Sequence, residues 1–151
     1  MRYSVTKGDK AMESPMRILV PALSIAALAL TGCAMSPAET ARAESDAAAS
    51  RAALGQQLAG LHATSTSDCM TNYGSSSLKA YGSTLVYSVS KSLVYVNDTT
   101  GGCENVERGD ILVTRSISGQ LCRGDIGQTV TPGSRVPSGS CALGSFTTYR
   151  K

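Results

Sequence analysis

Four cysteines, all of which follow residue 68, constrain the fold of this 151-residue chain more than any other feature. Zinc sites are usually built on close cysteine pairs such as Cys-x2-Cys. The spacings here are 34, 19 and 19 residues, which provide no such pair. A domain of about 80 residues is only marginally stable without cross-links. We therefore expect two disulfides, and neither a metal site nor a cofactor. The four residues are Cys69, Cys103, Cys122 and Cys141.

Three pairings of these cysteines are possible, and the sequence alone does not choose among them. The expected order of strands gives a weak preference for Cys103 with Cys122, because they flank one expected strand pair. The same preference pairs Cys69 with Cys141, which would tie the first segment of the domain to the last. Each bridge is expected to contribute about 2 to 4 kcal/mol, mainly by restricting the unfolded chain.

An apolar run from Ile18 to Leu30 follows Arg17 near the start of the chain. A basic residue, an apolar run and then small residues are typical of a secretory signal. The run is shorter than the roughly 20 residues that a helix needs to span a bilayer. We therefore expect export into an oxidising compartment, where paired thiols persist.

The residues that close this run, Leu30-Thr31-Gly32-Cys33, resemble the lipobox of bacterial lipoproteins. The resemblance implies that a signal peptide of residues 1–32 is removed and that Cys33 becomes the acylated N-terminus. Two buried acyl chains give stable membrane attachment. Ala34, in place of an aspartate, implies the outer membrane, facing the periplasm. The alternative is an ordinary signal peptide, or one membrane helix, with a chance cysteine.

An alanine-rich segment follows, and it begins with Ser36-Pro37-Ala38-Glu39, a capping-box signature. We expect a helix over residues 37–59 that ends near Gly60. Its apolar stripe is too narrow to build a core, and it consists of Leu54, Leu58 and Leu61. The helix is therefore expected to be a spacer or a weak coiled-coil contact, followed by a polar linker, His62–Asp68. Residues 33–68 thus form an expected tether, and residues 69–151 the folded domain.

The domain is expected to be mainly β. Leu85 to Asn97 is the clearest hairpin, because Leu85, Tyr87 and Val89 alternate with their neighbours and a second run of strand-forming residues, Leu93–Val96, follows Lys91-Ser92. Further strands are expected at 111–114, 120–122 and 129–131, and a last strand from Cys141 to Tyr149. Short strands separated by Gly, Ser and Pro favour a small antiparallel β-barrel or sandwich.

From Leu78 to Arg150 the chain also resembles a family of small exported proteobacterial proteins, domain of unknown function 6491. The resemblance covers about half of the chain and implies a disulfide-containing lipoprotein or secreted β domain with no established activity. The motifs that carry it are Thr84–Tyr87, Val94–Val96, Gly102-Cys103, Leu121–Asp125, Gly139–Cys141 and Phe146–Arg150.

Catalytic patterns are not expected in this domain. The single histidine, His62, lies in the expected linker, so a Ser-His-Asp arrangement lacks its base. There is no Gly-x-Ser-x-Gly and no Cys-x-x-Cys motif. Two carboxylates could act as an acid and base pair on a glycan, but a chain with no Trp and one Phe has little material for an apolar cleft. The carboxylates concerned are Glu104, Glu107, Asp110 and Asp125. We therefore expect no enzyme activity.

Two tripeptides, Arg108-Gly109-Asp110 and Arg123-Gly124-Asp125, match the adhesion sequence that integrins read. Gly-Asp before an apolar residue is also an ordinary turn into a strand, which is the interpretation we favour. The net charge of +3 over residues 69–151 is spread along the chain. Clustered basic residues on aromatic platforms, which nucleic-acid binding requires, are not evident.

These patterns favour a non-catalytic lipoprotein module that binds an envelope protein or glycan, with the membrane contacted through acyl chains. Tyrosines could contribute to a binding face or to the core, and they are Tyr81, Tyr87, Tyr95 and Tyr149. The alternatives are a structural or assembly component of an envelope complex, and an inhibitor similar to lysozyme-inhibiting lipoproteins. The Ser-Gly-x-x-Tyr loop expected of such inhibitors is not clear in this sequence.

Overall fold

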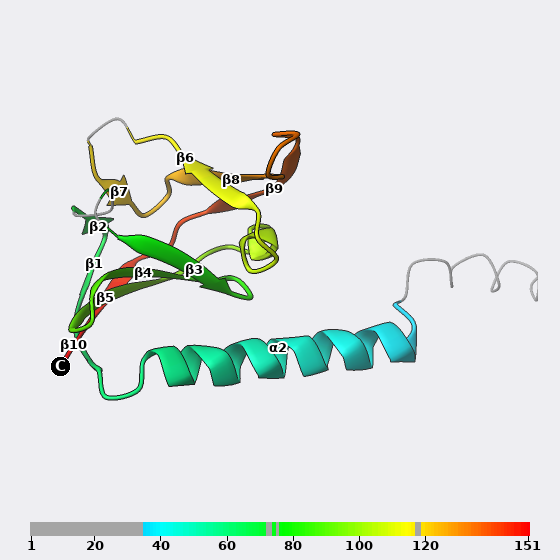
Figure 1. Cartoon of the computed structure of the whole chain (residues 1–151), viewed down its shortest axis with the longest axis horizontal. Helices are drawn as coiled ribbons and strands as arrows, with labels where there is room; N and C mark the ends of the chain where they lie inside the picture. The colour runs from blue at the N-terminus through cyan, green and yellow to red at the C-terminus, as the bar shows by residue number, and fades with distance from the viewer. Residues whose placement is uncertain (1–34, 72–73, 75, 117–118) are drawn as a thin grey trace, which may run out of the picture. The chain divides into compact units, whose positions relative to one another are not determined.

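The computed structural model describes residues 35–71, 74, 76–116 and 119–151. The expected signal peptide, the lipobox and Cys33 lie outside these residues. The described chain contains one α-helix, α2 (Pro37–Gln57), followed by short strands and a 3-10 turn, η3 (Glu104–Val106) (Figure 1). The strands are β1 (His62–Ser67), β2 (Cys69–Met70), β3 (Ser77–Tyr81), β4 (Thr84–Ser90), β5 (Leu93–Asp98), β6 (Ile111–Thr114), β7 (Leu121–Cys122), β8 (Ile126–Val130), β9 (Pro137–Ala142) and β10 (Phe146–Arg150).

The expected capping box starts α2. The Glu39 carboxylate accepts a hydrogen bond from the Ser36 backbone N–H at 2.9 Å, and Ser36 Oγ accepts one from the Glu39 N–H at 3.3 Å. Hydrogen bonds from the Ser36 backbone and side chain lower the pKa of Glu39. The helix start was therefore predicted correctly, because a capping box is a local interaction. No helix in the described part of the chain is long and apolar enough to cross a membrane.

A five-stranded antiparallel sheet with the order β1-β10-β5-β4-β3 is the centre of the fold. The expected hairpin is its β4–β5 pair, in which Tyr87 lies opposite Tyr95. Three consecutive residues of β4, Leu85, Val86 and Tyr87, are buried. Successive side chains on a strand point to opposite faces, so both faces of this sheet are covered.

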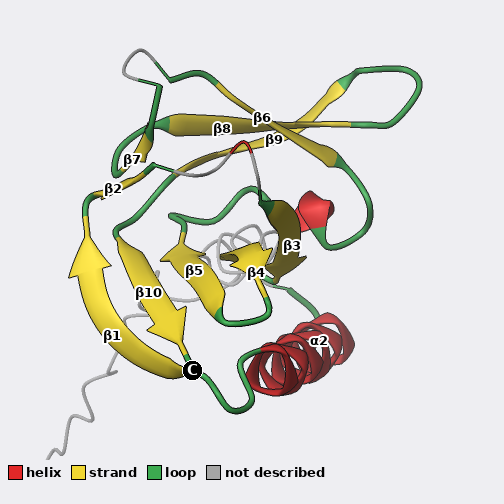
Figure 2. Cartoon of the chain, turned by 60° about the vertical axis from the view of Figure 1, so that its left-hand side comes forward, coloured by secondary structure: helices red, strands yellow, loops and turns green. Residues whose placement is uncertain are grey.

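One face of this sheet packs against the three-stranded sheet β6-β8-β9, as the two layers in Figure 2 show. Side chains from both sheets and from the short β2–β7 pair fill the space between the layers. The buried members of this main core are Met70, Ala80, Leu85, Tyr87, Leu121, Leu143 and Phe146. The fold is thus mainly β, with antiparallel sheets that do not close into a barrel.

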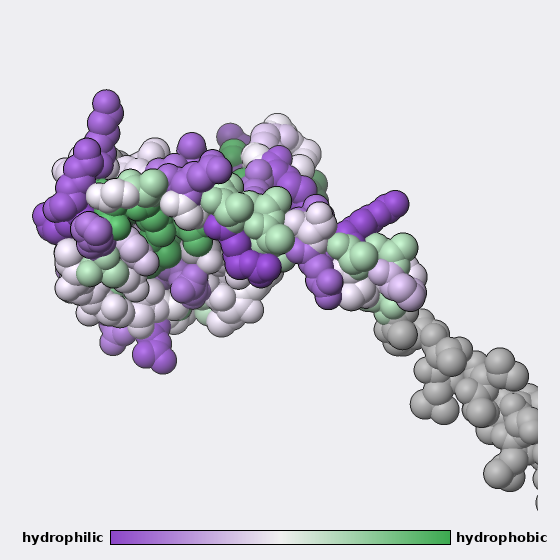
Figure 3. Space-filling view, turned by 90° about the horizontal axis from the view of Figure 1, so that it is seen from below, coloured by the Kyte–Doolittle hydropathy of each residue, from purple (hydrophilic) through white to green (hydrophobic). Residues whose placement is uncertain are grey.

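The other face of the sheet is covered by the end of α2. Leu54, Leu58 and Leu61 pack against valines of β4 and β5, with Tyr81 and Tyr149 beside them. Figure 3 views this side, and its strongly hydrophobic side chains gather on the left, while paler surface is mixed with hydrophilic side chains elsewhere. The leucine stripe therefore contacts this chain's own sheet, which we had not expected. The role of the helix as a spacer remains a prediction.

Two strand assignments from the sequence were wrong. The expected linker His62–Asp68 contains β1, which pairs with β10 although all six of its side chains are exposed. Backbone pairing to an edge needs no apolar pattern, so the polar sequence concealed the strand. The expected last strand is two strands, β9 and β10, which belong to different sheets. Leu143, buried in the main core, lies at the break between them.

Both disulfides are present, but the preferred pairing was wrong. The bridges join Cys69 to Cys122 and Cys103 to Cys141. Cys69 lies directly opposite Cys122 in the β2–β7 pair. Because β2 follows the unexpected strand β1, the partner of Cys69 could not be identified before that strand was known. Both pairings depend on which distant segments of the chain become neighbours, and no local pattern reports that.

Candidate functional site

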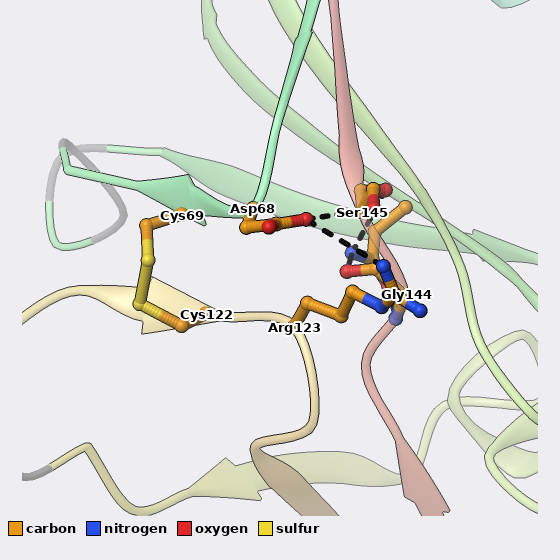
Figure 4. Close-up of polar contacts among 7 residues, drawn as sticks. Asp68, Cys69, Cys122, Arg123, Gly144 and Ser145 are labelled. Carbon is orange, nitrogen blue, oxygen red and sulfur yellow. Dashed lines mark hydrogen bonds and ion pairs between the residues drawn. A yellow bond between two sulfur atoms is a disulfide. The ribbon is translucent and has the colours of Figure 1, made fainter.

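Polar contacts join the segments next to the Cys69–Cys122 disulfide, and we call this region the corner. Figure 4 shows Asp68 pointing toward Ser145 and toward the guanidinium of Arg123. Ser145 Oγ donates to Asp68 Oδ1 at 3.1 Å, and the Arg123 backbone N–H donates to the Asp68 carbonyl at 2.6 Å. The Arg123 to Asp68 ion pair is 3.9 Å long and exposed, so it contributes less than about 1 kcal/mol.

Asn97 completes this corner from β5. Its side-chain amide donates to the Gly144 carbonyl at 2.7 Å and accepts from the Gly144 N–H at 3.0 Å. Asn97 is fully buried, so these bonds offset the cost of burying its amide. Because the polar groups here bond one another, this corner is structural and leaves little for a ligand.

Both Arg-Gly-Asp tripeptides form turns into strands, as we predicted. Gly109 and Gly124 have φ angles of 102° and 88°, and β6 and β8 begin two residues after them. Asp125 Oδ2 accepts from the Cys122 N–H at 2.8 Å, and Asp110 Oδ2 accepts from the hydroxyl of Ser138. Their carboxylates are therefore engaged within the fold.

The other two candidate carboxylates also hold turns. Glu104 accepts from the Gly102 N–H at 2.9 Å. Glu107 accepts from the Gly82 N–H at 2.9 Å and from Ser50 Oγ at 2.8 Å, so it links the β3–β4 turn to α2. His62 is exposed at the start of β1. In the described ranges no group of three or more His, Cys, Asp or Glu side chains could hold a metal ion.

All four candidate tyrosines pack against apolar clusters. Tyr87 lies in the main core with its ring centre 6.1 Å from that of Phe146, and Tyr95 packs against the same core. Tyr81 and Tyr149 pack against the cluster under α2, and Tyr81 Oη bonds Gln57 at 3.2 Å. Core packing, one of the two roles we considered, therefore accounts for all four.

A cleft opens between β3 and β6, where the two main sheets are not joined. In Figure 1 the arrow of β6 lies above that of β3. The cleft has a volume of about 410 Å³, and both edges contribute to its walls. Its lining is mostly apolar and consists of Ser76, Leu78, Tyr87, Leu112, Val113, Thr114 and Leu121. We call this the β3–β6 cleft.

Within the described residues, the hydroxyl of Tyr87 is the buried side-chain polar atom that lacks a hydrogen-bond partner. Tyr87 is only 4% exposed, and its hydroxyl is buried without a hydrogen-bond partner. Burial raises the pKa of this phenol well above its ordinary value. A buried hydroxyl without a partner costs about 1 to 3 kcal/mol, so a ligand that bonds it recovers part of that cost.

The outer face of the three-stranded sheet exposes three aliphatic side chains beside the polar Gln128 and Ser140. Ile111, Val113 and Ile126 are 52%, 44% and 58% exposed, and we call them the outer patch. Val113 and Ile126 line a cavity of about 440 Å³ together with Arg115 and Asp125. Exposed aliphatic side chains that lie on one face of a sheet make that face a candidate interaction site.

Sequence reasoning missed both the cleft and the outer patch. Successive side chains of β6 point to opposite faces of its sheet. An apolar residue at each position, Ile-Leu-Val, was the signal that the exposed face is apolar too. The cleft has no local signal, because its two walls lie more than 30 residues apart in the chain.

Comparison with known proteins identifies no relative of this chain. No protein-family model matches it, and no curated protein or solved structure is similar to it. The resemblance to domain of unknown function 6491 therefore remains an expectation based on the sequence motifs alone.

Proposed function

We propose that this chain is a lipid-anchored envelope protein whose β domain binds another envelope component and catalyses no reaction. The exposed outer patch carries the proposal, because three large aliphatic side chains gather on one face of a small sheet. Covering such side chains with a partner surface is favourable, since apolar area leaves water.

The polar residues of the domain support a binding role over an enzymatic one. The carboxylates that we considered as an acid and base pair accept hydrogen bonds that close turns. General acid-base catalysis needs a group within reach of the substrate's proton and free to exchange it. Groups that hold turns in place do not suit this task.

Anchoring through Cys33 is part of the same proposal and has its own test. Growth with labelled palmitate should label the wild-type protein and leave Cys33→Ser unlabelled. Mass spectrometry of the mature protein should find the acylated cysteine as residue one. A mature N-terminus elsewhere, with an unmodified Cys33, would contradict the anchor and leave the binding role to be tested separately.

Site-specific photo-cross-linking in intact cells tests the binding role. A benzophenone amino acid replaces Val113 in the outer patch, and in a control protein it replaces Thr66, which is exposed on β1. We expect a discrete adduct from position 113 and none from position 66. Absence of an adduct at 111, 113 and 126, or the same adducts at 66, would overturn the proposal.

A further inference from the structure

The edge of β6 is unpaired in the described part of the structure. The three-stranded sheet has the order β6-β8-β9, so β6 pairs only with β8. The opposite edge of this sheet is occupied, because the Thr100 N–H bonds the Ala142 carbonyl at 3.1 Å and Thr100 Oγ1 accepts from the Ala142 N–H at 3.0 Å. An edge strand directs the N–H and C=O groups of alternate residues outward.

The β6 edge differs from the other strand edges in its side chains. Natural edge strands usually carry charges, prolines or bulges that prevent pairing with another chain. β3, at the edge that faces β6, has Lys79 at its centre. β1, at the other edge of the five-stranded sheet, is polar except for Ala63. The sequence of β6 is Ile-Leu-Val-Thr, which contains none of these protective features.

The β3–β6 cleft lies directly beside this edge. Leu112, Val113 and Thr114 of β6 form one wall of the cleft, and Leu78 of β3 lies in the lining with them. Tyr87 belongs to the same lining, and its buried hydroxyl has no hydrogen-bond partner. A strand added to β6 would place alternate side chains in this cleft and supply peptide groups that the hydroxyl can bond.

We propose that β6 accepts an extended segment of a partner protein as an added antiparallel or parallel strand, with an apolar side chain of that segment in the β3–β6 cleft. The inference rests on the binding function proposed above and specifies how the partner is held. Main-chain bonds to β6 supply affinity, and the cleft selects the inserted side chain. The remaining side chains of the added strand extend the outer patch beside Ile111 and Val113.

Peptide selection tests this mode of binding. A phage-displayed library of random dodecapeptides is selected on the full-length acylated protein in phospholipid nanodiscs. We expect the selected peptides to share alternating Val, Ile, Leu or Thr residues. Single N-methylation of a selected peptide should then lower its affinity by about tenfold or more at every second position, since only alternate N–H groups face β6.

A pair of threonine substitutions tests the position of the added strand. Thr114→Lys places a charge in the cleft on β6, and Thr66→Lys makes the same change on the edge strand β1. We expect Thr114→Lys to weaken the selected peptide by about tenfold or more. The Thr66→Lys control should bind within about twofold of the wild type. Unchanged binding by a folded Thr114→Lys protein would overturn the assignment to β6.

A second pair of variants tests the tyrosine hydroxyl. Tyr87→Phe removes the unpartnered hydroxyl, and Tyr95→Phe makes the same change on β5, where the ring is not part of the cleft lining. We expect Tyr87→Phe to weaken the peptide several-fold without lowering the melting temperature. Loss of affinity that is equal in both variants would contradict a direct bond to Tyr87.

The remaining outcomes separate this inference from the proposed function. Strand addition would be overturned if N-methylation lowered peptide affinity with no alternation along the peptide. It would also be overturned if lauric acid bound the cleft and no selected peptide did. Cross-links at position 126 that persist in Thr114→Lys would retain the binding function and overturn the mode inferred here. Absence of cross-links at every outer-patch position would remove both.

Discussion

The carbonyl oxygen of Gly102 occupies the space that a Cβ atom on Gly139 would need. A Cβ atom on Gly102 would likewise meet the carbonyl oxygen of Ser140, the residue after Gly139. The backbones of two distant segments therefore touch without side chains between them. Cys103 and Cys141, which follow these glycines closely, form the buried disulfide. The contact holds the segment after β5 against β9.

Gly139→Ala should therefore destabilise the domain. The new methyl group would be forced against the Gly102 backbone and lie 2.9 Å from Thr129 Oγ1, and overpacking of this kind costs about 1 to 3 kcal/mol. Urea unfolding measures the change. Gly55→Ala is the control, because its added methyl group meets nothing within 4 Å beyond its own stretch of helix, and the helix should gain about 1 kcal/mol. Equal stability of Gly139→Ala and the wild type would contradict the close approach.

The two disulfides should be reduced in a fixed order. Cys103 and Cys141 are only 1% and 3% exposed, whereas Cys69 and Cys122 are half-buried. A thiolate must reach the sulfur that it attacks, so mild reductant should open Cys69–Cys122 first. Alkylation with a mass tag and peptide mapping identify the thiols released. Earlier labelling of Cys103 and Cys141 in folded protein would contradict this order.

Tyr87 should make the fold sensitive to strongly alkaline pH. Its folded-state pKa is raised by burial, so the unfolded chain releases the phenol proton first, near pH 10. The stabilisation is complete below about pH 10 and decreases as the pH rises above it. Urea midpoints measured between neutral pH and about pH 11 should fall more for the wild type than for Tyr87→Phe. Parallel curves for the two proteins would contradict the burial of this hydroxyl.

Acid should destabilise the first turn of α2, because the pKa of Glu39 is lowered in the folded chain, whereas that of Tyr87 is raised. The hydrogen bonds from Ser36 lower the pKa of Glu39 in the folded chain. Their stabilisation is present above the ordinary glutamate pKa of about 4.3 and is lost as the pH falls through the lowered value. Amide NMR signals of the first turn should shift over this range. Ser36→Ala removes the side-chain cap but keeps the backbone N–H that bonds the Glu39 carboxylate, so it should reduce the shift in the pKa of Glu39 without abolishing it.

Leu54→Ala should release the end of α2 from the sheet. Leu54 is half-buried against valines of β4 and β5, so its truncation should cost about 1 to 2 kcal/mol, less than at a fully buried site. Hydrogen exchange of the last turns of α2 should become faster. Gln56→Ala, an exposed neighbour, should leave the exchange rates unchanged. Equal rates in Leu54→Ala and the wild type would show that the helix end is not docked.

The sequence was a good guide wherever neighbouring residues determine the structure. The capping box at Ser36, the β4–β5 hairpin and the turns at Gly109 and Gly124 were all predicted correctly. Each depends on hydrogen bonds or backbone angles within a few residues. The polar strand β1 was missed because its pairing with β10 leaves no alternating pattern in the side chains.

Composition and spacing by themselves determined that this chain is a small, mainly β protein with two disulfides. The tertiary structure decided which cysteines pair, where the leucine stripe packs, and that β3 and β6 leave a cleft between them. Each of these depends on which distant segments become neighbours. That choice is made by the packing of whole sheet faces, which favours one arrangement only when all the strands are present together.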